Sequence, residues 1–144
     1  MPTVKQILAA KSAGVRTIEA THTVYAAVTL LAAYQIGALV VVEDGRAVGI
    51  FSERDYARKG ILKARRAHET LVSELMSSPL ITVQPDQPME DCMQLMTERR
   101  IRHLPVMDGE ELVGMVTIGD VVMHTIRQQR STIEQLEGYI IGKY

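Results

Sequence analysis

Two copies of one short motif contain the side chains that are best placed to bind a ligand. The motif reads Gly-x-x-Ser/Thr-x-x-Asp and occupies residues 49–55 and 114–120. The hydroxyl residue and the acid stand three positions apart, which is the spacing of a capping box at the start of a helix. The first turn of a helix also offers unpaired N–H groups that favour phosphate, and a carboxylate can accept both hydroxyls of a ribose. One copy alone favours capping, whereas its recurrence favours a ligand cleft, and the two roles are compatible.

The two motifs belong to a longer internal repeat. An offset of 65 residues pairs residues 17–55 with residues 82–120 without a gap, and apolar positions match apolar positions throughout. Each unit predicts a short extended segment, a helix, two strands joined by a hairpin that contains Asp-Gly, and a closing helix. The expected helices are 24–35 and 89–100, and the expected strands are 39–42, 47–51, 104–107 and 112–116. The closing helices should begin near Ser52 and Thr117.

The repeat predicts how the chain is organised. A unit of about 60 residues buries little apolar surface alone, so two pseudo-symmetric units should share a core and pack through their sheets. We expect an α/β (α+β) fold with the order β-α-β-β-α occurring twice around an approximate two-fold axis. The predicted boundaries are a first repeat at 1–62, an exposed polar linker at 63–71, a second repeat at 72–130 and a helical extension at 131–144.

Composition limits the classes of function. Hydrophobic residues make up 47% and charged residues 23% of the chain, and the net charge is -1, so nothing demands nucleic acid or an anionic membrane. The single cysteine permits no intrachain disulfide and fits a reducing, cytoplasmic compartment. Residues 20–42 contain no Asp, Glu, Lys or Arg and could suggest a membrane span. Their copy in the second repeat contains Glu90, Asp91 and Arg99, so both stretches are expected to hold helices of a folded domain outside any membrane.

The repeated pattern resembles the CBS repeat, which is named for cystathionine β-synthase. The matching pieces are 17–18, 37–41 and 49–55 in the first copy and 82–83, 101–106 and 114–120 in the second. The resemblance covers nearly the whole chain and implies a stand-alone pair of CBS repeats. It implies a regulatory module that binds an adenine nucleotide, has no catalytic cofactor and forms a homodimer.

The resemblance also implies a set of site residues. The two motif aspartates would bind ribose hydroxyls, and the motif hydroxyl residues would bind ribose or phosphate. The threonines of the two extended segments, with the backbone of the residue after each, would line an adenine slot. These residues are Ser52, Asp55, Thr117, Asp120, Thr17, Ile18, Thr82 and Val83.

Basic side chains are implied in only one of the two sites. Arg102 and His103 stand where the family often places residues that contact phosphate, and we expect them to act with the aspartate of their own repeat. The first repeat has Gly37 and Ala38 at the corresponding positions, so its site should lack these cations. Arg54 would either supply charge there or lie in solvent.

The candidate ligands are AMP, ADP, ATP and NAD, and the basic pair argues against S-adenosylmethionine. A bound nucleotide would favour one packing of the repeats and signal to a separate, unidentified protein effector. One alternative is a nucleotide-processing enzyme, although no nucleophile with a base, no Gly-rich phosphate loop and no carboxylate cluster is evident. Another alternative is a nucleic-acid-binding accessory protein, which the net charge and an aromatic content of 4% disfavour. No metal site is expected, because the histidines lack metal-ligand spacing.

The C-terminal segment carries a second pattern. Apolar residues follow one another in steps of three and four, with Gln129 filling one gap, as in a heptad stripe. The stripe consists of Val122, Ile126, Ile133, Leu136 and Ile140. It predicts a long helix that packs either on its own body or on a partner subunit, and the family resemblance favours the partner.

Overall fold

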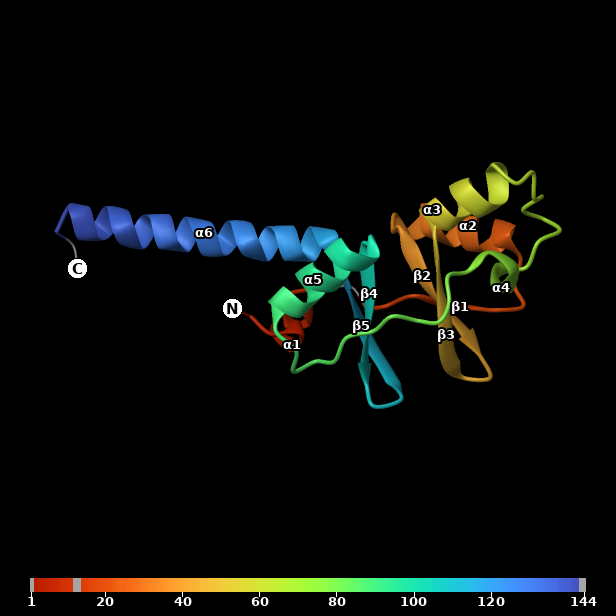
Figure 1. The fold of residues 1–144 in the computed structure, drawn as a ribbon, viewed down its shortest axis with the longest axis horizontal. Helices are drawn as coiled ribbons and strands as arrows, with labels where there is room; N and C mark the ends of the chain where they lie inside the picture. Colours follow the sequence, from red (N-terminus) through yellow and green to blue (C-terminus); the bar gives the residue numbers. More distant parts are fainter. Residues whose placement is uncertain (1, 12–13, 143–144) are drawn as a thin grey trace.

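The computed structural model describes residues 2–11 and 14–142. Its elements follow the predicted order, with one additional short helix at the start of each repeat (Figure 1). They are α1 (Val4–Ala9), β1 (Thr17–Glu19), α2 (Val24–Tyr34), β2 (Ala38–Glu43), β3 (Arg46–Ser52), α3 (Glu53–Asp55), the π-helical segment η1 (Tyr56–Ile61), α4 (Val72–Leu75), α5 (Met89–Arg99), β4 (His103–Asp108), β5 (Glu111–Thr117) and α6 (Ile118–Ile140).

Each half of the chain builds its own small sheet. In the first half β2 pairs in parallel with β1 and antiparallel with β3. In the second half β4 and β5 are antiparallel, and Val83 forms a single parallel bridge to Val106 at the place that β1 holds in the first half. The predicted α+β fold of two β-α-β-β-α units is therefore confirmed, with the opening strand of the second unit reduced to one bridge.

The internal repeat extends to the backbone conformation. Gln35 and Arg100, which are 65 residues apart, end α2 and α5 in the left-handed region with φ of 53° in both. The register of the first hairpin shifts between Val41 and Val42, and that of the second shifts at the two corresponding residues. Because left-handed non-glycine residues and bulges are uncommon, their recurrence at equivalent positions supports one fold used twice.

Each repeat's leading helix completes the core of the other repeat. Val4 and Ile7 of α1 are fully buried among the core residues of the second half, and the Val4 amide donates to the Gln87 carbonyl at 2.8 Å. Val72 and Leu75 of α4 are buried in the core of the first half. This exchange holds the repeats together, because the core of each repeat includes residues of the leading helix of the other repeat.

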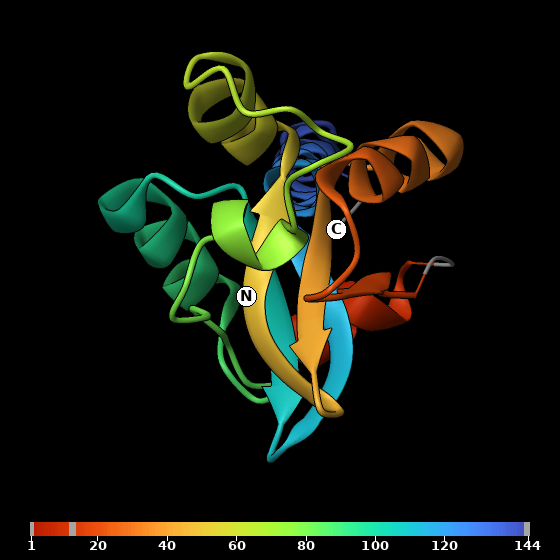
Figure 2. The same ribbon diagram turned by 90° about the vertical axis from the view of Figure 1, so that its right-hand side faces the viewer.

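The two sheets meet in a small shared cluster. Ala38 and Val40 of β2 contact Met115 of β5 there, with partly buried apolar residues of both hairpins around them. The end-on view in Figure 2 shows the two hairpins stacked, with the helices arranged around them. The predicted packing of the repeats through their sheets is thus present. Residues 63–69 of the linker are exposed apart from half-buried Ala67.

The helix α6 runs without interruption from Ile118 to Ile140 and leaves the body of the molecule (Figure 1). Val121 is buried near its start, whereas the side chains from 129 to 137 are exposed. The predicted extension is helical as far as Ile140, and residues 143 and 144 lie outside the described residues. Within 2–11 and 14–142, no helix combines the length and the apolar character needed to cross a membrane.

Candidate functional site

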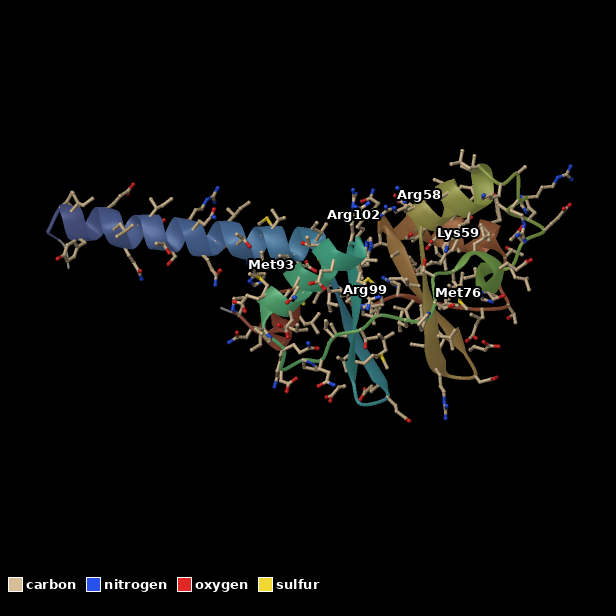
Figure 3. All side chains as sticks on the ribbon, viewed as in Figure 1. Arg58, Lys59, Met76, Met93, Arg99 and Arg102 are labelled. Atoms are coloured by element: carbon tan, nitrogen blue, oxygen red, sulfur yellow. The ribbon has the colours of Figure 1, made fainter. Side chains whose placement is uncertain are left out.

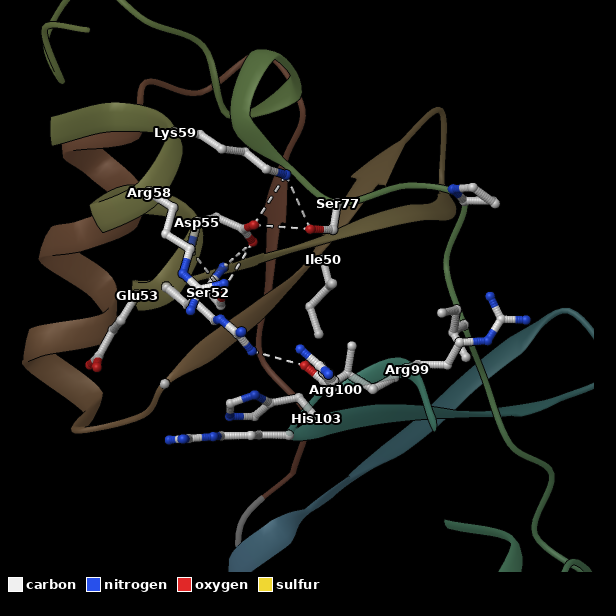
Figure 4. Close-up of a pocket in the computed structure, with 16 residues that line it drawn as sticks. Ile50, Ser52, Glu53, Asp55, Arg58, Lys59, Ser77, Arg99, Arg100 and His103 are labelled. Carbon is white, nitrogen blue, oxygen red and sulfur yellow. Dashed lines mark hydrogen bonds and ion pairs between the residues drawn. The ribbon is translucent and has the colours of Figure 1, made fainter. Parts of the chain in front are cut away.

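A cavity of about 630 Å³ lies between the two halves and is lined by both. The first half contributes the end of β3 and the start of the closing helix, and the second half contributes the end of α5 and the start of β4 (Figure 4). The lining consists of residues 37, 50, 52–55, 58, 59, 77, 79, 81 and 99–103. We call it the first cavity.

The first cavity is strongly basic. Six lysine and arginine side chains stand against two acidic ones, Glu53 and Asp55, which leaves a surplus of four positive charges. The basic residues are Arg54, Arg58, Lys59, Arg99, Arg100 and Arg102 (Figures 3 and 4). Because walls of low dielectric strengthen the field of charges gathered in a cleft, this arrangement attracts an anionic ligand.

Ser52 and Asp55 form the capping box that their spacing predicts. The Ser52 hydroxyl accepts from the Asp55 amide at 3.1 Å, and Asp55 Oδ2 accepts from the Ser52 amide and hydroxyl, each at 3.0 Å. Asp55 Oδ1 accepts from the Ser77 hydroxyl at 2.9 Å and lies 3.2 Å from Lys59 Nζ. The carboxylate lines the cavity with both oxygens engaged, so a sugar diol would have to replace Ser77 or Lys59.

Arg102 and His103 line the first cavity, together with Ser52 and Asp55 of the other repeat. The expectation that the first-repeat site lacks these cations is therefore wrong. The Arg102 carbonyl accepts from the Ile118 amide at 2.9 Å, so its backbone does lie at the helix start of its own repeat. The residue nevertheless lines the cavity to which Ser52 and Asp55 belong, because the two halves face each other across that cavity.

A second, smaller cavity of about 320 Å³ occupies the pseudo-symmetric position. Its lining includes Gly37, Ala38 and Thr117, with Lys11 and Arg16 as basic residues. Asp120 is not part of that lining. Its Oδ2 atom accepts from the Thr117 amide at 2.8 Å and forms an ion pair of 2.8 Å with Lys11. The second cavity is therefore the one that lacks the arginine cluster.

His103 lines both cavities, and Gly37 makes room for it. A Cβ atom at Gly37 would lie 3.1 Å from His103 Nε2, closer than such atoms usually come. Burial lowers the pKa of His103; Glu53 and Asp120 oppose this effect, whereas Arg102 and Lys11 add to it. The imidazole is thus held in its neutral form at physiological pH.

The predicted adenine slot is not part of either cavity. Ile18 and Val83 are buried in the two cores, and both backbone polar groups of Val83 already bond to the neighbouring strand. Thr17 and Thr82 also lie outside both linings, and Arg16 and Ile81, one residue earlier in each repeat, take their place. The physical reason is that Thr17 already belongs to β1 and Thr82 directly precedes the bridge at Val83, whereas the cavities lie beside the residues that precede the two threonines.

Several residues that line the first cavity, on helices and just after α4, are not among the predicted site residues. Ser77, Arg58, Arg99 and Arg100 all line it, and none was assigned to a nucleotide site. The signal for the two helix residues was present, because they stand just before Arg102 in the sequence. Among residues 2–11 and 14–142, no three His, Cys, Asp or Glu side chains gather closely enough to hold a metal ion.

Comparisons with known proteins agree with this architecture. The family model of the CBS domain matches residues 4–61 and 72–126. The mitochondrial CBS domain-containing protein CBSX3 of Arabidopsis thaliana is 43% identical over 127 residues, which cover 85% of this chain and 62% of that protein. The CBS domain-containing protein YhcV of Bacillus subtilis is 35% identical over 115 residues, or 80% of this chain and 81% of that protein.

A solved structure shows the same fold. It belongs to a Burkholderia ambifaria MC40-6 protein that is described as a signal-transduction protein with CBS domains. The two chains superimpose with a TM-score of 0.85 at 45% sequence identity, over 89% of this chain and 96% of that one.

Proposed function

The chain belongs to the CBS-domain family, and from this premise we propose that it is a regulatory module that binds an adenine nucleotide in the first cavity. The observation that carries the proposal is the surplus of four positive charges around a cavity of about 630 Å³. A cavity of this size is typical of small-molecule sites. The family supports adenosine as the common part of the ligand, and the charge supports phosphate.

Among AMP, ADP, ATP and NAD, the charge of the first cavity favours ATP. Arginine forms paired hydrogen bonds with phosphate oxygens, and several arginines can share a chain of phosphates. Arg58, Arg99 and Arg102 come from different elements and line the same space, so they can reach successive phosphates. AMP would leave much of this charge unbalanced, and NAD carries fewer charges on its two phosphates.

The remaining lining suits the nucleoside. Ile50, Ile81 and Ile101 offer an apolar wall on which a base can pack. Ser52 and Asp55 stand at the polar end, and Asp55 can accept a ribose hydroxyl if Ser77 releases its Oδ1 atom. In this arrangement the base contacts both repeats and the phosphates lie among the arginines.

Ligand binding would be transmitted through the contact between repeats. The first cavity is lined from both halves, so a nucleotide stabilises the arrangement in which the halves bind it together. A second arrangement of the two halves, with lower affinity for the nucleotide, would present a different surface to a separate protein effector. Nucleotide binding would then change which surface the effector meets.

Isothermal titration calorimetry with ATP, ADP, AMP, NAD and adenosine tests the proposal. We expect ATP to bind most tightly, adenosine most weakly, and the preference for ATP to shrink at high salt. Arg102→Ala should weaken ATP binding by about tenfold or more, whereas the matched control Lys63→Ala, in the exposed linker, should not. Equal affinities for ATP and adenosine, or equal losses in both variants, would refute the assignment.

Two alternatives are separated in the same experiments. A nucleic-acid-binding accessory protein would bind a single-stranded oligonucleotide more tightly than ATP and would be as sensitive to Lys63→Ala as to Arg102→Ala. A nucleotide-processing enzyme would convert ATP or NAD to a product on incubation, which chromatography of the released nucleotides detects.

A further inference from the structure

Lys11, which follows the residue that ends α1, binds the motif aspartate of the second repeat. Its ammonium nitrogen donates to Asp120 Oδ2 at 2.8 Å and to the carbonyl oxygen of Met115 at 2.9 Å. The ion pair is mostly shielded from solvent, with 23% of the Lys11 side chain and 17% of the Asp120 side chain exposed. Two of the three donors of the ammonium group are thus committed to acceptors of the second repeat.

The second cavity presents an ammonium group where the first cavity presents a carboxylate. Asp55 lines the first cavity, whereas the lining of the second cavity contains Lys11 and not Asp120. A ribose offers two hydroxyl donors that need an acceptor, and an ammonium group has none. A diol that reached Asp120 would have to break the ion pair and leave a partly buried charge without its partner, which is costly.

The two motif aspartates differ in how easily a ligand can replace their partners. Asp55 Oδ1 accepts from the neutral Ser77 hydroxyl at 2.9 Å, and a ribose hydroxyl can replace that donor with a bond of the same kind. Lys59 also lies 3.2 Å from Asp55, but 44% of its side chain is exposed, so its ammonium group can move into water at little cost. Lys11 is about half as exposed, and its two bonds are shorter than those of Lys59.

The internal repeat gives the first cavity no counterpart of Lys11. The offset of 65 residues pairs Lys11 with Met76, which packs against the core of the first half and has no charge to offer an acid. The same offset pairs Arg102 of the first cavity with Gly37 of the second. The first cavity is therefore lined by its motif aspartate and the arginine cluster, whereas the lining of the second cavity contains neither.

We propose that Lys11 keeps nucleotides out of the second cavity, so that the chain binds one adenine nucleotide, in the first cavity. Lys11 is then a specificity-determining residue: its charge occupies Asp120, and removing that charge makes the carboxylate available and creates a second nucleotide site. The inference rests on the function proposed above, because the ribose of the nucleotide is the group that needs a motif aspartate. With Lys11 replaced, the second lining retains Arg16 for a phosphate, so this site suits AMP better than ATP.

The number of AMP molecules bound per chain, measured by isothermal titration calorimetry and equilibrium dialysis, tests the proposal. We expect the wild type to bind one AMP and Lys11→Met to bind two, because methionine has a side chain of similar length without the charge. Adding Asp120→Asn to Lys11→Met should weaken the second binding event by about tenfold or more. The matched control is Lys5→Met, at an exposed position of the same helix α1, which should bind one AMP as the wild type does.

The outcomes separate this proposal from that of the first cavity. A wild-type chain that binds two AMP molecules, or a folded Lys11→Met chain that still binds one, would overturn the role of Lys11 and leave the function of the first cavity intact. Binding of one AMP by Lys11→Met and of none by the wild type would support the role of Lys11 and refute nucleotide binding in the first cavity. A lack of AMP and ATP binding in both chains would overturn both proposals. Thermal unfolding of each variant establishes that it is folded.

Discussion

Arg54 Nη1 donates a hydrogen bond of 2.8 Å to the carbonyl oxygen of Arg100. The bond joins the closing helix of the first repeat to the left-handed residue that ends α5 in the second repeat. Both residues line the first cavity, so the bond between the repeats forms part of the wall of the candidate site. A ligand in the first cavity would therefore lie beside residues that hold the two repeats together.

Replacing Arg54 with alanine separates its two roles. The bond is exposed, so its loss should lower the free energy of unfolding by only about 1 kcal/mol or less. ATP affinity should fall by more, because a cation of the cavity is lost as well. Urea unfolding and calorimetry measure the two effects. The control is Arg46→Ala, an exposed arginine of β3 outside the cavity. An unchanged ATP affinity in Arg54→Ala would show that the arginine serves only the contact between repeats.

The two motif aspartates should differ in their effect on stability. Asp55 accepts from Ser52 and Ser77 and pairs with Lys59, whereas Asp120 accepts from the Thr117 amide and pairs with Lys11. Asp55→Ala should therefore cost about 2–4 kcal/mol and Asp120→Ala about 1–2 kcal/mol in urea unfolding. Nucleotide affinity should fall mainly in Asp55→Ala. The reverse order in either measurement would contradict the assignment of the first cavity as the site.

A pair of equivalent glycines tests the exchange of leading segments between repeats. A Cβ atom at Gly49 would lie 2.9 Å from the backbone oxygen of Ser77, whereas one at Gly114 would lie 2.8 Å from methyl groups of Leu8. A side-chain end can move, but a backbone oxygen held in a bridge to Ile50 cannot move as easily. Gly49→Ala should thus cost about 2–3 kcal/mol and Gly114→Ala about 1 kcal/mol or less.

Thermal unfolding of both variants gives the comparison. The cost of Gly114→Ala should be smaller in a Leu8→Ala background than in the wild-type chain, because the methyl groups in question are then absent. Equal losses of stability at the two glycines would contradict this reasoning. They would mean that the backbone at Ser77 gives way to a new methyl group as easily as the Leu8 side chain does.

The repeat made the fold predictable from sequence. Helix starts at Ser52 and Thr117 depend on residues three positions away, and hairpin turns depend on an Asp-Gly pair, so both are local properties. Because the two copies have matching apolar positions, the same helices and strands are predicted in each half. These features are confirmed by the capping boxes and the two equivalent sheets.

The composition of the site was not predictable in the same way. Which half Arg102 reaches depends on how the two repeats pack, and that packing arises from contacts between residues such as Val40 and Met115, far apart in the chain. Nothing local to Arg102 distinguishes its own aspartate from the one in the other repeat. The burial of Val4 and Ile7 in the second core is another long-range outcome of this kind.

The buried imidazole of His103 should make stability depend on pH. Its pKa in the folded protein is lowered by burial from an ordinary value of about 6.5. Below about pH 6.5 the unfolded chain therefore binds a proton that the folded protein resists. Stability should be greatest above that pH and should fall as the pH drops through it towards the lower folded pKa. Urea unfolding at several values between about pH 5 and pH 8 measures the slope.

His103→Gln removes the titrating group and should flatten this part of the profile, whereas His22→Gln, at an exposed position, should not. Since Glu53 opposes the lowering of the pKa of His103, Glu53→Gln should deepen the loss of stability at low pH. Bound ATP should do the opposite if its phosphates lie beside the imidazole, because a nearby anion favours the protonated form. A profile that is identical in wild type and His103→Gln would mean that the imidazole is as well solvated in the folded protein as in the unfolded chain.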